Sequence, residues 1–131
     1  MMKNTTPILF LDDERNPEDV TWVKYPENSA FTVVRTFEEF CVAVSLNDYD
    51  KYSFDHDIQD FHTIPKGGSV FNPIFGEIEV NEEIEYEYKG THCLEFLLSK
   101  RSDLGVDAII IHTQNPTGRE NMLIAKKNME K

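Results

Sequence analysis

The sequence predicts a single α/β domain over residues 1–131, with a mostly parallel four-stranded sheet between two layers of helices and an inserted β-hairpin. Three observations predict this fold. Apolar runs alternate with helical stretches along the chain, which is typical of parallel sheets. The length of 131 residues suits one hydrophobic core. Residues 59–89 interrupt the alternation and read as an insertion.

The first predicted strand is the continuous apolar run Ile8–Leu11, which is typical of a strand buried on both faces. Residues 15–20, RNPEDV, predict a turn with one helical turn, because Pro17 suits a first helical position. Residues 30–36, AFTVVRT, are rich in β-branched side chains and predict the second strand.

A helix is predicted over residues 37–46, with Thr36 as its cap and Glu39 in a capping-box position. A short third strand is predicted over residues 52–58, YSFDHDI. Within the insertion, residues 76–88 alternate apolar and acidic side chains, which predicts a hairpin of GEIEV with EIEYEY.

The last third of the chain predicts a helix, a strand and a helix. Residues 91–103 carry apolar side chains at helical spacing, and Gly105 suits the stop. Residues 107–113, DAIIIHT, predict the last strand. Residues 114–130 then predict a terminal helix with lysines near its C-terminus, where the helix dipole favours them.

Polar clusters follow three of the predicted strands: Asp12-Asp13, Asp55-His56-Asp57 and His112-Thr113. Ligands of parallel α/β sheets bind beyond the carboxyl ends of the strands, so we expect these clusters to meet at one edge. Like charges this close need a cation or shifted pKa values. The expected metal ligands are Asp12, Asp13, Asp55 and Asp57.

Carboxylate oxygens favour Mg²⁺ or Mn²⁺, and a histidine ligand would open the site to Zn²⁺. His56 and His112 are the candidate acid and base, with Asp55 beside them. The alternative interpretation is structural: Asp12 caps a turn, Asp13 pairs with Arg15, and each histidine is a hydrogen-bonded structural group. His62 is expected at the surface.

The segment NPTGRENM at 115–122 predicts a phosphate site, because a helix N-terminus offers free N–H groups. The expected phosphate ligands are Thr113, Asn115 and Arg119, with Gly118 permitting close approach and Arg15 steadying the acidic pair or the substrate. Ordinary helix capping, with Arg119 in an ion pair, is the alternative.

The net charge of −11 excludes broad attraction to long duplex nucleic acid, which requires basic side chains. Six glutamates lie within residues 77–87, so the predicted hairpin carries about half of the charge imbalance. Cys41 and Cys93 are predicted as buried free thiols. With no secretory signal and no apolar run that could span a membrane, we expect a cytoplasmic protein.

Four motifs in this order, LFLDDERNP, SFDHDI, GTHCLEFL and IIIHTQNPTGRENM, resemble the cyclic-phosphate processing receiver-like domains. The resemblance implies a response-regulator receiver fold, in which Asp12, Asp13 and Asp55 match the Mg²⁺ and phosphoacceptor positions and Thr113 matches the hydroxyl residue. The receiver lysine after a fifth strand has no counterpart here. The implied activity is hydrolysis of cyclic phosphates, on 2′,3′-cyclic RNA ends or cyclic nucleotides.

The leading hypothesis is therefore a metal-dependent cyclic-phosphate phosphoesterase. The first alternative is a binding module that holds a nucleotide or phosphorylated ligand without cleaving it. A second alternative is a receiver that accepts phosphate on Asp55, against which the missing lysine argues. A third is an adaptor that docks a protein partner on the acidic hairpin, which otherwise is a lid over the cleft.

Overall fold

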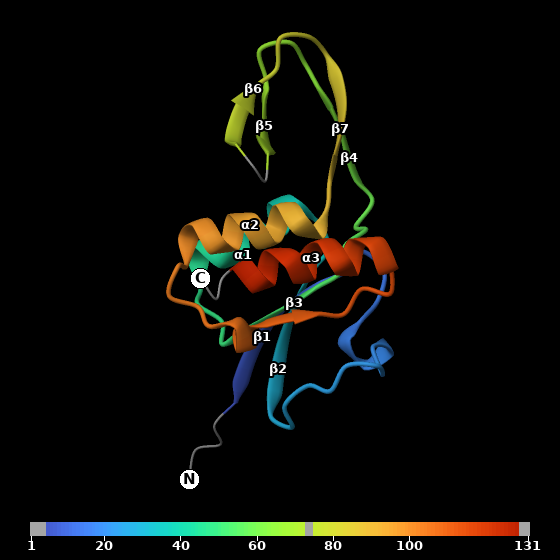
Figure 1. Ribbon diagram of the computed structural model, residues 1–131, viewed down its shortest axis with the longest axis vertical. Helices are drawn as coiled ribbons and strands as arrows, with labels where there is room; N and C mark the ends of the chain where they lie inside the picture. The colour runs from blue at the N-terminus through green and yellow to red at the C-terminus, as the bar shows by residue number, and fades with distance from the viewer. Residues whose placement is uncertain (1–4, 73–74, 129–131) are drawn as a thin grey trace.

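The computed structural model describes residues 5–72 and 75–128, and its centre is a parallel four-stranded sheet (Figure 1). The strand order is β2-β1-β3-β8, and the three pairings between neighbours are all parallel. The predicted α/β class with a parallel four-stranded sheet is confirmed. The strands of this sheet are β1 (Thr6–Leu11), β2 (Ser29–Val34), β3 (Lys51–Phe54) and β8 (Ile109–Ile111).

The carboxyl ends of these strands lie at the same level. Leu11 is opposite both Val34 and Phe54, and Phe54 is opposite Ile111. The residue that follows β1, β3 or β8 still donates one backbone hydrogen bond to the neighbouring strand, as Asp55 does to the Leu11 carbonyl at 2.9 Å. The polar residues that follow β1, β3 and β8 are therefore held at one edge of the sheet, as predicted.

All three helices of the described residues cover the same face of the sheet (Figure 1). Side chains alternate along a strand, and the alternate residues Leu9, Leu11, Tyr52 and Phe54 share one core cluster with side chains from every helix. The expectation of helices on both faces is thus wrong for the described residues. The helices are α1 (Phe37–Leu46), α2 (Gly90–Lys100) and α3 (Pro116–Asn128).

The second face of the sheet is covered by the connection from β1 to β2, residues 12–28. Its regular structure is one turn of 3-10 helix, η1 (Pro17–Asp19). Tyr25 from this connection packs edge-on against Phe10 and Phe31, with ring centroids 6.4 and 5.1 Å away. The turn with one helical turn that the sequence predicted over residues 15–20 is confirmed as η1, and the rest of the connection, which contains two prolines and lacks an apolar stripe at helical spacing, is a loop.

The predicted helix over residues 37–46 is confirmed as α1. The Thr36 side chain accepts the Glu39 N–H at 3.1 Å, which caps the helix as expected. The Glu39 carboxylate reaches one residue further back than in a standard capping box and accepts the Arg35 N–H at 2.8 Å. A second 3-10 turn, η2 (Val106–Ala108), leads into β8.

Residues 60–88, here called the arm, project from the domain next to α2 (Figure 1). The arm contains two antiparallel ribbons, in which β4 pairs with β7 and β5 pairs with β6. The predicted pairing of GEIEV with EIEYEY is therefore wrong, because these two segments belong to different ribbons. The strands are β4 (Asp60–Ile64), β5 (Ser69–Asn72), β6 (Gly76–Glu79) and β7 (Ile84–Tyr88).

Charge repulsion explains why the expected hairpin does not form. A hairpin that kept every glutamate on one face would set Glu79 opposite Glu85 and Glu77 opposite Glu87, and facing like charges destabilise a sheet. In the observed registers, Glu85 faces Thr63, Glu87 faces Phe61, and both glutamates of β6 face uncharged residues of β5. The alternating pattern predicted strands correctly but could not choose their partners.

Both cysteines are free thiols, as predicted, although Cys41 is only partly buried while Cys93 is fully buried. Among the described residues, no helix is both long and apolar enough to cross a membrane.

Candidate functional site

A hollow of about 200 Å³ lies at the carboxyl edge of the sheet, where the sequence predicted a site. We call it the acidic pocket. The loops after β1, β3 and β8 all contribute to its wall, so three sequence-distant segments meet there. Its lining residues are Asp12, Asp13, Glu14, Arg15, Asp55, Asp57, Gln59, Thr113, Gln114 and Asn115.

Three carboxylates in the acidic pocket could share one cation. Asp12, Asp13 and Asp55 each offer an oxygen, and these atoms lie within 4.8 Å of one another. Asp12 and Asp55 are only 1% and 6% exposed. Asp57 lines the pocket but is not part of this group, because its carboxylate is bonded to His56 and Asn115. The structure thus groups three of the four predicted metal ligands.

Burial and neighbouring charges raise the pKa values of two of these three carboxyl groups. Burial raises the pKa of Asp55, and the nearby Asp12 charge adds to the rise. Burial also raises the pKa of Asp13, with further contributions from the Asp12 and Asp55 charges. These two side chains therefore carry repulsion that a bound cation would relieve.

Asp12 is the exception, because hydrogen bonds hold it as a carboxylate. Burial alone would raise its pKa, but the bond from His112 and the backbone N–H groups of Arg15 and Glu14 outweigh burial and lower the pKa. Oδ1 accepts the Glu14 and Arg15 N–H groups at 2.9 and 2.8 Å. Oδ2 lies 3.1 Å from His112 Nε2. Asp12 is therefore a fixed negative charge in the pocket.

His112 lies beneath the acidic pocket and does not line it. Its side chain is 0% exposed and stacks on Phe10 with ring centroids 4.5 Å apart. Nδ1 lies 2.7 Å from Ser53 Oγ, which lies 2.7 Å from the Tyr25 hydroxyl. These contacts form a buried chain from Tyr25 through Ser53 and His112 to Asp12, so His112 has no atom facing the hollow that a substrate could touch.

His56 is also nearly buried and does not line the pocket. Its Nδ1 lies 3.0 Å from Asp57 Oδ1. Its ring packs against the first turn of α3, where a Cβ on Gly118 would lie 2.3 Å from His56 Cγ. Gly118 does permit a close approach, as expected, but the group that approaches is this imidazole.

The start of α3 follows the capping alternative. The Asn115 side-chain oxygen accepts the Gly118 N–H at 3.1 Å, and its amide group donates to Asp57. Both ends of the Asn115 side chain are therefore engaged within the protein. Burial alone would raise the pKa of Asp57, but the bonds from Asn115 and His56 lower it.

The remaining predicted phosphate ligands divide into two groups. Arg15 and Thr113 line the acidic pocket. Thr113 is 2% exposed, and its hydroxyl hydrogen bond opposes the rise in the pKa of Asp55. Arg119 is exposed on the first turn of α3 and is not among the lining residues. Arg15 is the one Lys or Arg among those lining residues.

The structure adds residues that sequence reasoning missed. Arg35, directly after β2, donates to the backbone carbonyls of Asp12 and Arg15 at 3.1 and 2.6 Å and so braces the loop that carries the acidic pair. Gln59 and Gln114 line the pocket. Arg35 had a usable signal, since it ends a predicted strand as the acidic pairs do, whereas Ser53 and Tyr25 carried none.

The other histidines lie in or near the arm. His62 is exposed, as predicted, and is 2.7 Å from Asp60. His92 is buried at the start of α2, where its Nδ1 accepts the Lys89 N–H and its Nε2 contacts the Tyr86 hydroxyl, both at 2.9 Å. Burial lowers the pKa of His92 to about 4.

Comparison with known proteins identifies one family. The sequence profile of the cyclic-phosphate processing receiver domain matches residues 8–128, a range that runs through the arm. No curated protein and no solved structure shows a significant match. The match covers most of the chain and agrees with the parallel sheet and with the acidic residues at its carboxyl edge. The chain therefore belongs to the cyclic-phosphate processing receiver domain family.

Proposed function

We propose that the protein hydrolyses cyclic phosphodiesters, such as 2′,3′-cyclic phosphates of nucleotides or RNA ends, with the help of a divalent cation. The observation that carries the proposal is the trio of Asp12, Asp13 and Asp55 oxygens within 4.8 Å of one another in a pocket that also contains Arg15 and Thr113. The family match supplies the class of substrate.

The residues present fit a hard divalent cation. The donor set consists of carboxylate oxygens, which suit Mg²⁺ and Mn²⁺. Neither His56 nor His112 lines the pocket, so Zn²⁺ is the less favoured ion. Burial, with a further contribution from the neighbouring carboxylate charges, raises the pKa values of Asp13 and Asp55, and a positive charge would offset both effects. When bound, such a cation would neutralise charge on the phosphate and favour ionisation of a water molecule.

The reaction itself is a balanced displacement at phosphorus. An oxygen of water forms a bond to phosphorus while the bond to one ribose oxygen breaks. The proton lost by water ends on the departing oxygen, so the products are a phosphomonoester and a free hydroxyl. Neither imidazole lines the pocket, so the carboxylate oxygens of its wall are the protein groups within reach of this proton.

The other side chains bind or position. The Arg15 guanidinium supplies positive charge to a phosphate oxygen, and the Thr113 hydroxyl lies on the same wall. His112 acts through Asp12: an ionised carboxylate only accepts, so Nε2–H of His112 donates and orients it. His56 and Asn115 hold Asp57 in place. Arg119 is not among the residues that line the pocket, and the proposed mechanism gives it no role.

The second candidate function is binding of a nucleotide or phosphorylated ligand without cleavage. The specific observation in its favour is that neither imidazole lines the pocket, which leaves proton transfer to carboxyl groups. Transfer of phosphate to Asp55 is less well supported, because the pocket lining includes no lysine. The arm remains a candidate for docking a protein partner or for covering the pocket.

Turnover of nucleoside 2′,3′-cyclic monophosphates by the pure protein, with Mg²⁺, Mn²⁺ or Zn²⁺, tests the proposal. We expect Asp55→Asn to abolish turnover and His112→Ala to reduce it strongly, whereas the exposed Asp48→Asn serves as a matched control with full activity. Recovery of intact ligand after stoichiometric binding would favour the second candidate. If the protein neither turned over nor bound any of these nucleotides with any of the three metals, both candidate functions would be wrong.

A further inference from the structure

Trp22 is the single tryptophan of the chain and stands in the connection that covers the second face of the sheet. Its side chain is 38% exposed, which is unusual for the largest apolar side chain. It is nevertheless held in place, because its Nε1–H donates to the His112 carbonyl at 2.8 Å. An exposed aromatic ring that is fixed by a hydrogen bond costs little entropy to use in binding.

Trp22 is connected to the acidic pocket through Arg15. The Arg15 guanidinium carbon lies 5.2 Å from the centre of the indole ring, within the range of a cation–π contact. The same guanidinium donates to Gln114 Oε1 at 3.3 Å, and both Arg15 and Gln114 line the pocket. The carbonyl that holds the indole belongs to His112, next to the lining residue Thr113.

We infer that Trp22 and Arg15 form a stacking platform for the heterocyclic base of a nucleotide whose cyclic phosphate lies in the acidic pocket. The inference rests on the proposed function and narrows its substrate class to base-bearing cyclic phosphates, as opposed to base-free ones such as cyclic glycerophosphate. Indole and guanidinium planes stack on any base, so the platform selects for a base without selecting its identity.

The charge of the protein makes such a platform useful. At a net charge of −11, the chain repels an anionic substrate at long range. Arg15 is the one Lys or Arg of the acidic pocket wall, so beyond the proposed cation the wall offers the phosphate a single positive side chain. Stacking depends weakly on charge and therefore adds affinity where ionic contacts are few.

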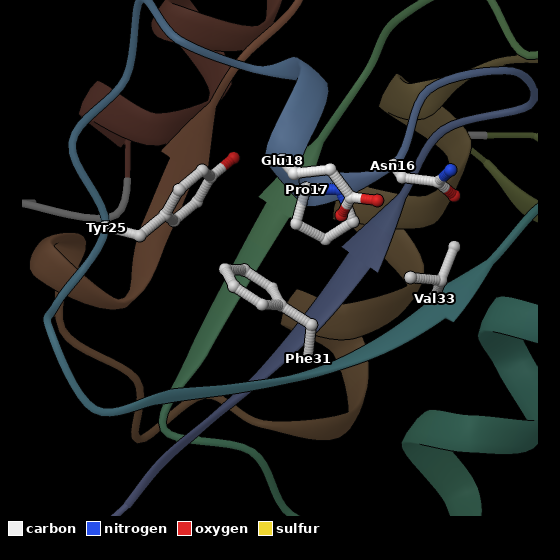
Figure 2. Close-up of a pocket in the computed structure, with 6 residues that line it drawn as sticks. All are labelled: Asn16, Pro17, Glu18, Tyr25, Phe31 and Val33. Carbon is white, nitrogen blue, oxygen red and sulfur yellow. The ribbon is translucent and has the colours of Figure 1, made fainter.

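A second aromatic hollow could compete for the base. Figure 2 shows it between η1 and the sheet, with Tyr25, Phe31 and Pro17 on its wall. It shares no lining residue with the acidic pocket. Arg35 also ties down the loop between them by donating to Asp12 and Arg15 carbonyls. Trp22, which is joined to the acidic pocket by Arg15, is the better-placed ring, and Phe31 supplies a matched control.

Intrinsic fluorescence gives a direct test, because all tryptophan emission of the chain comes from Trp22. With Mg²⁺ present, we expect a nucleoside 2′,3′-cyclic monophosphate to quench this emission at saturation and glycerol 1,2-cyclic phosphate to leave it unchanged. Free N-acetyltryptophanamide corrects for light absorbed by the nucleotide. Equal responses to both compounds, or saturable nucleotide binding without a change in emission, would overturn the inference.

Two substitutions separate stacking from a structural role. Trp22→Leu removes the plane but keeps apolar volume, whereas Trp22→Phe keeps a plane and loses the N–H. We expect Trp22→Leu to raise KM for the nucleotide about ten-fold with kcat nearly unchanged, and to leave KM for the base-free phosphate unchanged. Trp22→Phe should restore most of the affinity for the nucleotide that Trp22→Leu loses. Phe31→Leu should leave the KM values of both substrates unchanged.

The outcomes distinguish the inference from the function on which it rests. Turnover of both substrates with equal losses in Trp22→Leu would mean that Trp22 only supports the fold, and the inference would fail alone. Turnover and binding of neither substrate by the unaltered protein would remove the proposed function, and the inference with it. If Trp22→Leu does not fold, the fluorescence of the unaltered protein still decides.

Discussion

The carboxyl edge of the sheet and the arm both concentrate negative charge, but they arrange it in opposite ways. At the edge, three carboxylate oxygens lie within 4.8 Å of one another, and Asp12 and Asp55 are buried. In the arm, the paired glutamates face uncharged residues, and those at 77, 79, 82, 83 and 85 are exposed. Repulsion is therefore retained at the edge, where a ligand can relieve it, and avoided in the arm.

The two regions meet at Gly90, where the chain returns from the arm to begin α2. Its N–H donates to the His56 carbonyl at 2.8 Å, and a Cβ added there would lie 2.0 Å from the Asp55 carbonyl oxygen. The helix can approach the edge this closely only with glycine. A substitution at this junction should therefore disturb both regions at once and have the largest effect on stability.

The largest effect is expected for Gly90→Ala. The methyl group would meet backbone atoms that cannot rotate away, so we expect the free energy of unfolding in urea to fall by about 3 kcal/mol or more. Gly105→Ala is the matched control, because a Cβ there meets nothing within 4 Å. Equal stabilities of the two variants would show that α2 does not need this close approach.

The second prediction concerns pH and the base of the arm. His92 accepts the Lys89 N–H and contacts Tyr86, whose hydroxyl donates to the Phe71 carbonyl at 3.1 Å. Burial lowers the pKa of His92 to about 4 from 6.5. Between pH 6.5 and about 4, His92 therefore binds a proton in the unfolded chain but not in the folded chain. The stability that neutral His92 contributes is complete above pH 6.5 and is lost as pH falls toward 4.

We expect this histidine to account for about 2 kcal/mol of the acid destabilisation, measured by urea unfolding at several pH values. His92→Gln should flatten that part of the profile, because glutamine can accept the Lys89 N–H in the same capping position without titrating. Asn81→Gln, a substitution that involves no titratable group at an exposed arm position, is the control and should leave the profile as it was. A profile unchanged by His92→Gln would contradict the assignment.

The third prediction compares a buried serine of the edge with an exposed serine of the arm. Ser53 is 0% exposed and lies 2.7 Å from both His112 Nδ1 and the Tyr25 hydroxyl. Because Asp12 is a carboxylate and accepts from Nε2, a neutral His112 must accept from Ser53 at Nδ1. Ser53→Ala leaves Nδ1 without its donor and should cost about 1.5 kcal/mol.

Imidazole ¹⁵N chemical shifts, which report which ring nitrogen of His112 carries the proton, test this series of hydrogen bonds directly. The unaltered protein should show His112 protonated at Nε2, and Ser53→Ala should show a mixture of tautomers together with weaker Mn²⁺ binding. Ser69→Ala removes a hydroxyl that bonds Glu77 at 3.0 Å on the arm surface, and should change stability by less than about 0.5 kcal/mol. A His112 protonated at Nδ1 in the unaltered protein would contradict the prediction.

The sequence predicted best what is decided locally. The helix over 37–46 is bounded by a capping threonine and carries its own apolar stripe, so neighbouring residues suffice to define it. The meeting of Asp12 and Asp55 followed from the general rule for parallel sheets. The alternation in the arm likewise predicted β6 and β7 as strands.

What the sequence could not predict depends on contacts between distant residues. The partner of each arm strand is chosen by charge and by aromatic packing, such as the stacking of Phe37 of α1 on Tyr88 with ring centroids 4.3 Å apart. The burial of His112 depends on Ser53, which lies 59 residues away in the chain. A histidine that follows an apolar strand can face the hollow or the core, and the pattern of one sequence does not distinguish the two.

The last prediction, with the smallest expected effect, compares the two acidic regions most directly, because the same chemical change is made in each. Asp13→Asn and Glu79→Gln each remove one negative charge. Burial raises the pKa of Asp13 above 3.8, and the Asp12 and Asp55 charges add to the rise. The folded protein therefore binds more protons than the unfolded chain just above pH 3.8, and the ionised side chain lowers stability as pH rises through that window.

At neutral pH, Asp13→Asn should consequently raise the free energy of unfolding of the metal-free protein by up to about 1 kcal/mol, while Glu79→Gln should change it by less than about 0.5 kcal/mol. Saturating Mg²⁺ should reverse the order, because the cation stabilises the unaltered protein and Glu79→Gln through three carboxylates but finds only two in Asp13→Asn. Thermal unfolding with and without Mg²⁺ measures both. If Asp13→Asn gained as much stability from Mg²⁺ as Glu79→Gln, the edge would be merely acidic, like the arm, and the contrast between retained and avoided repulsion would have no functional meaning.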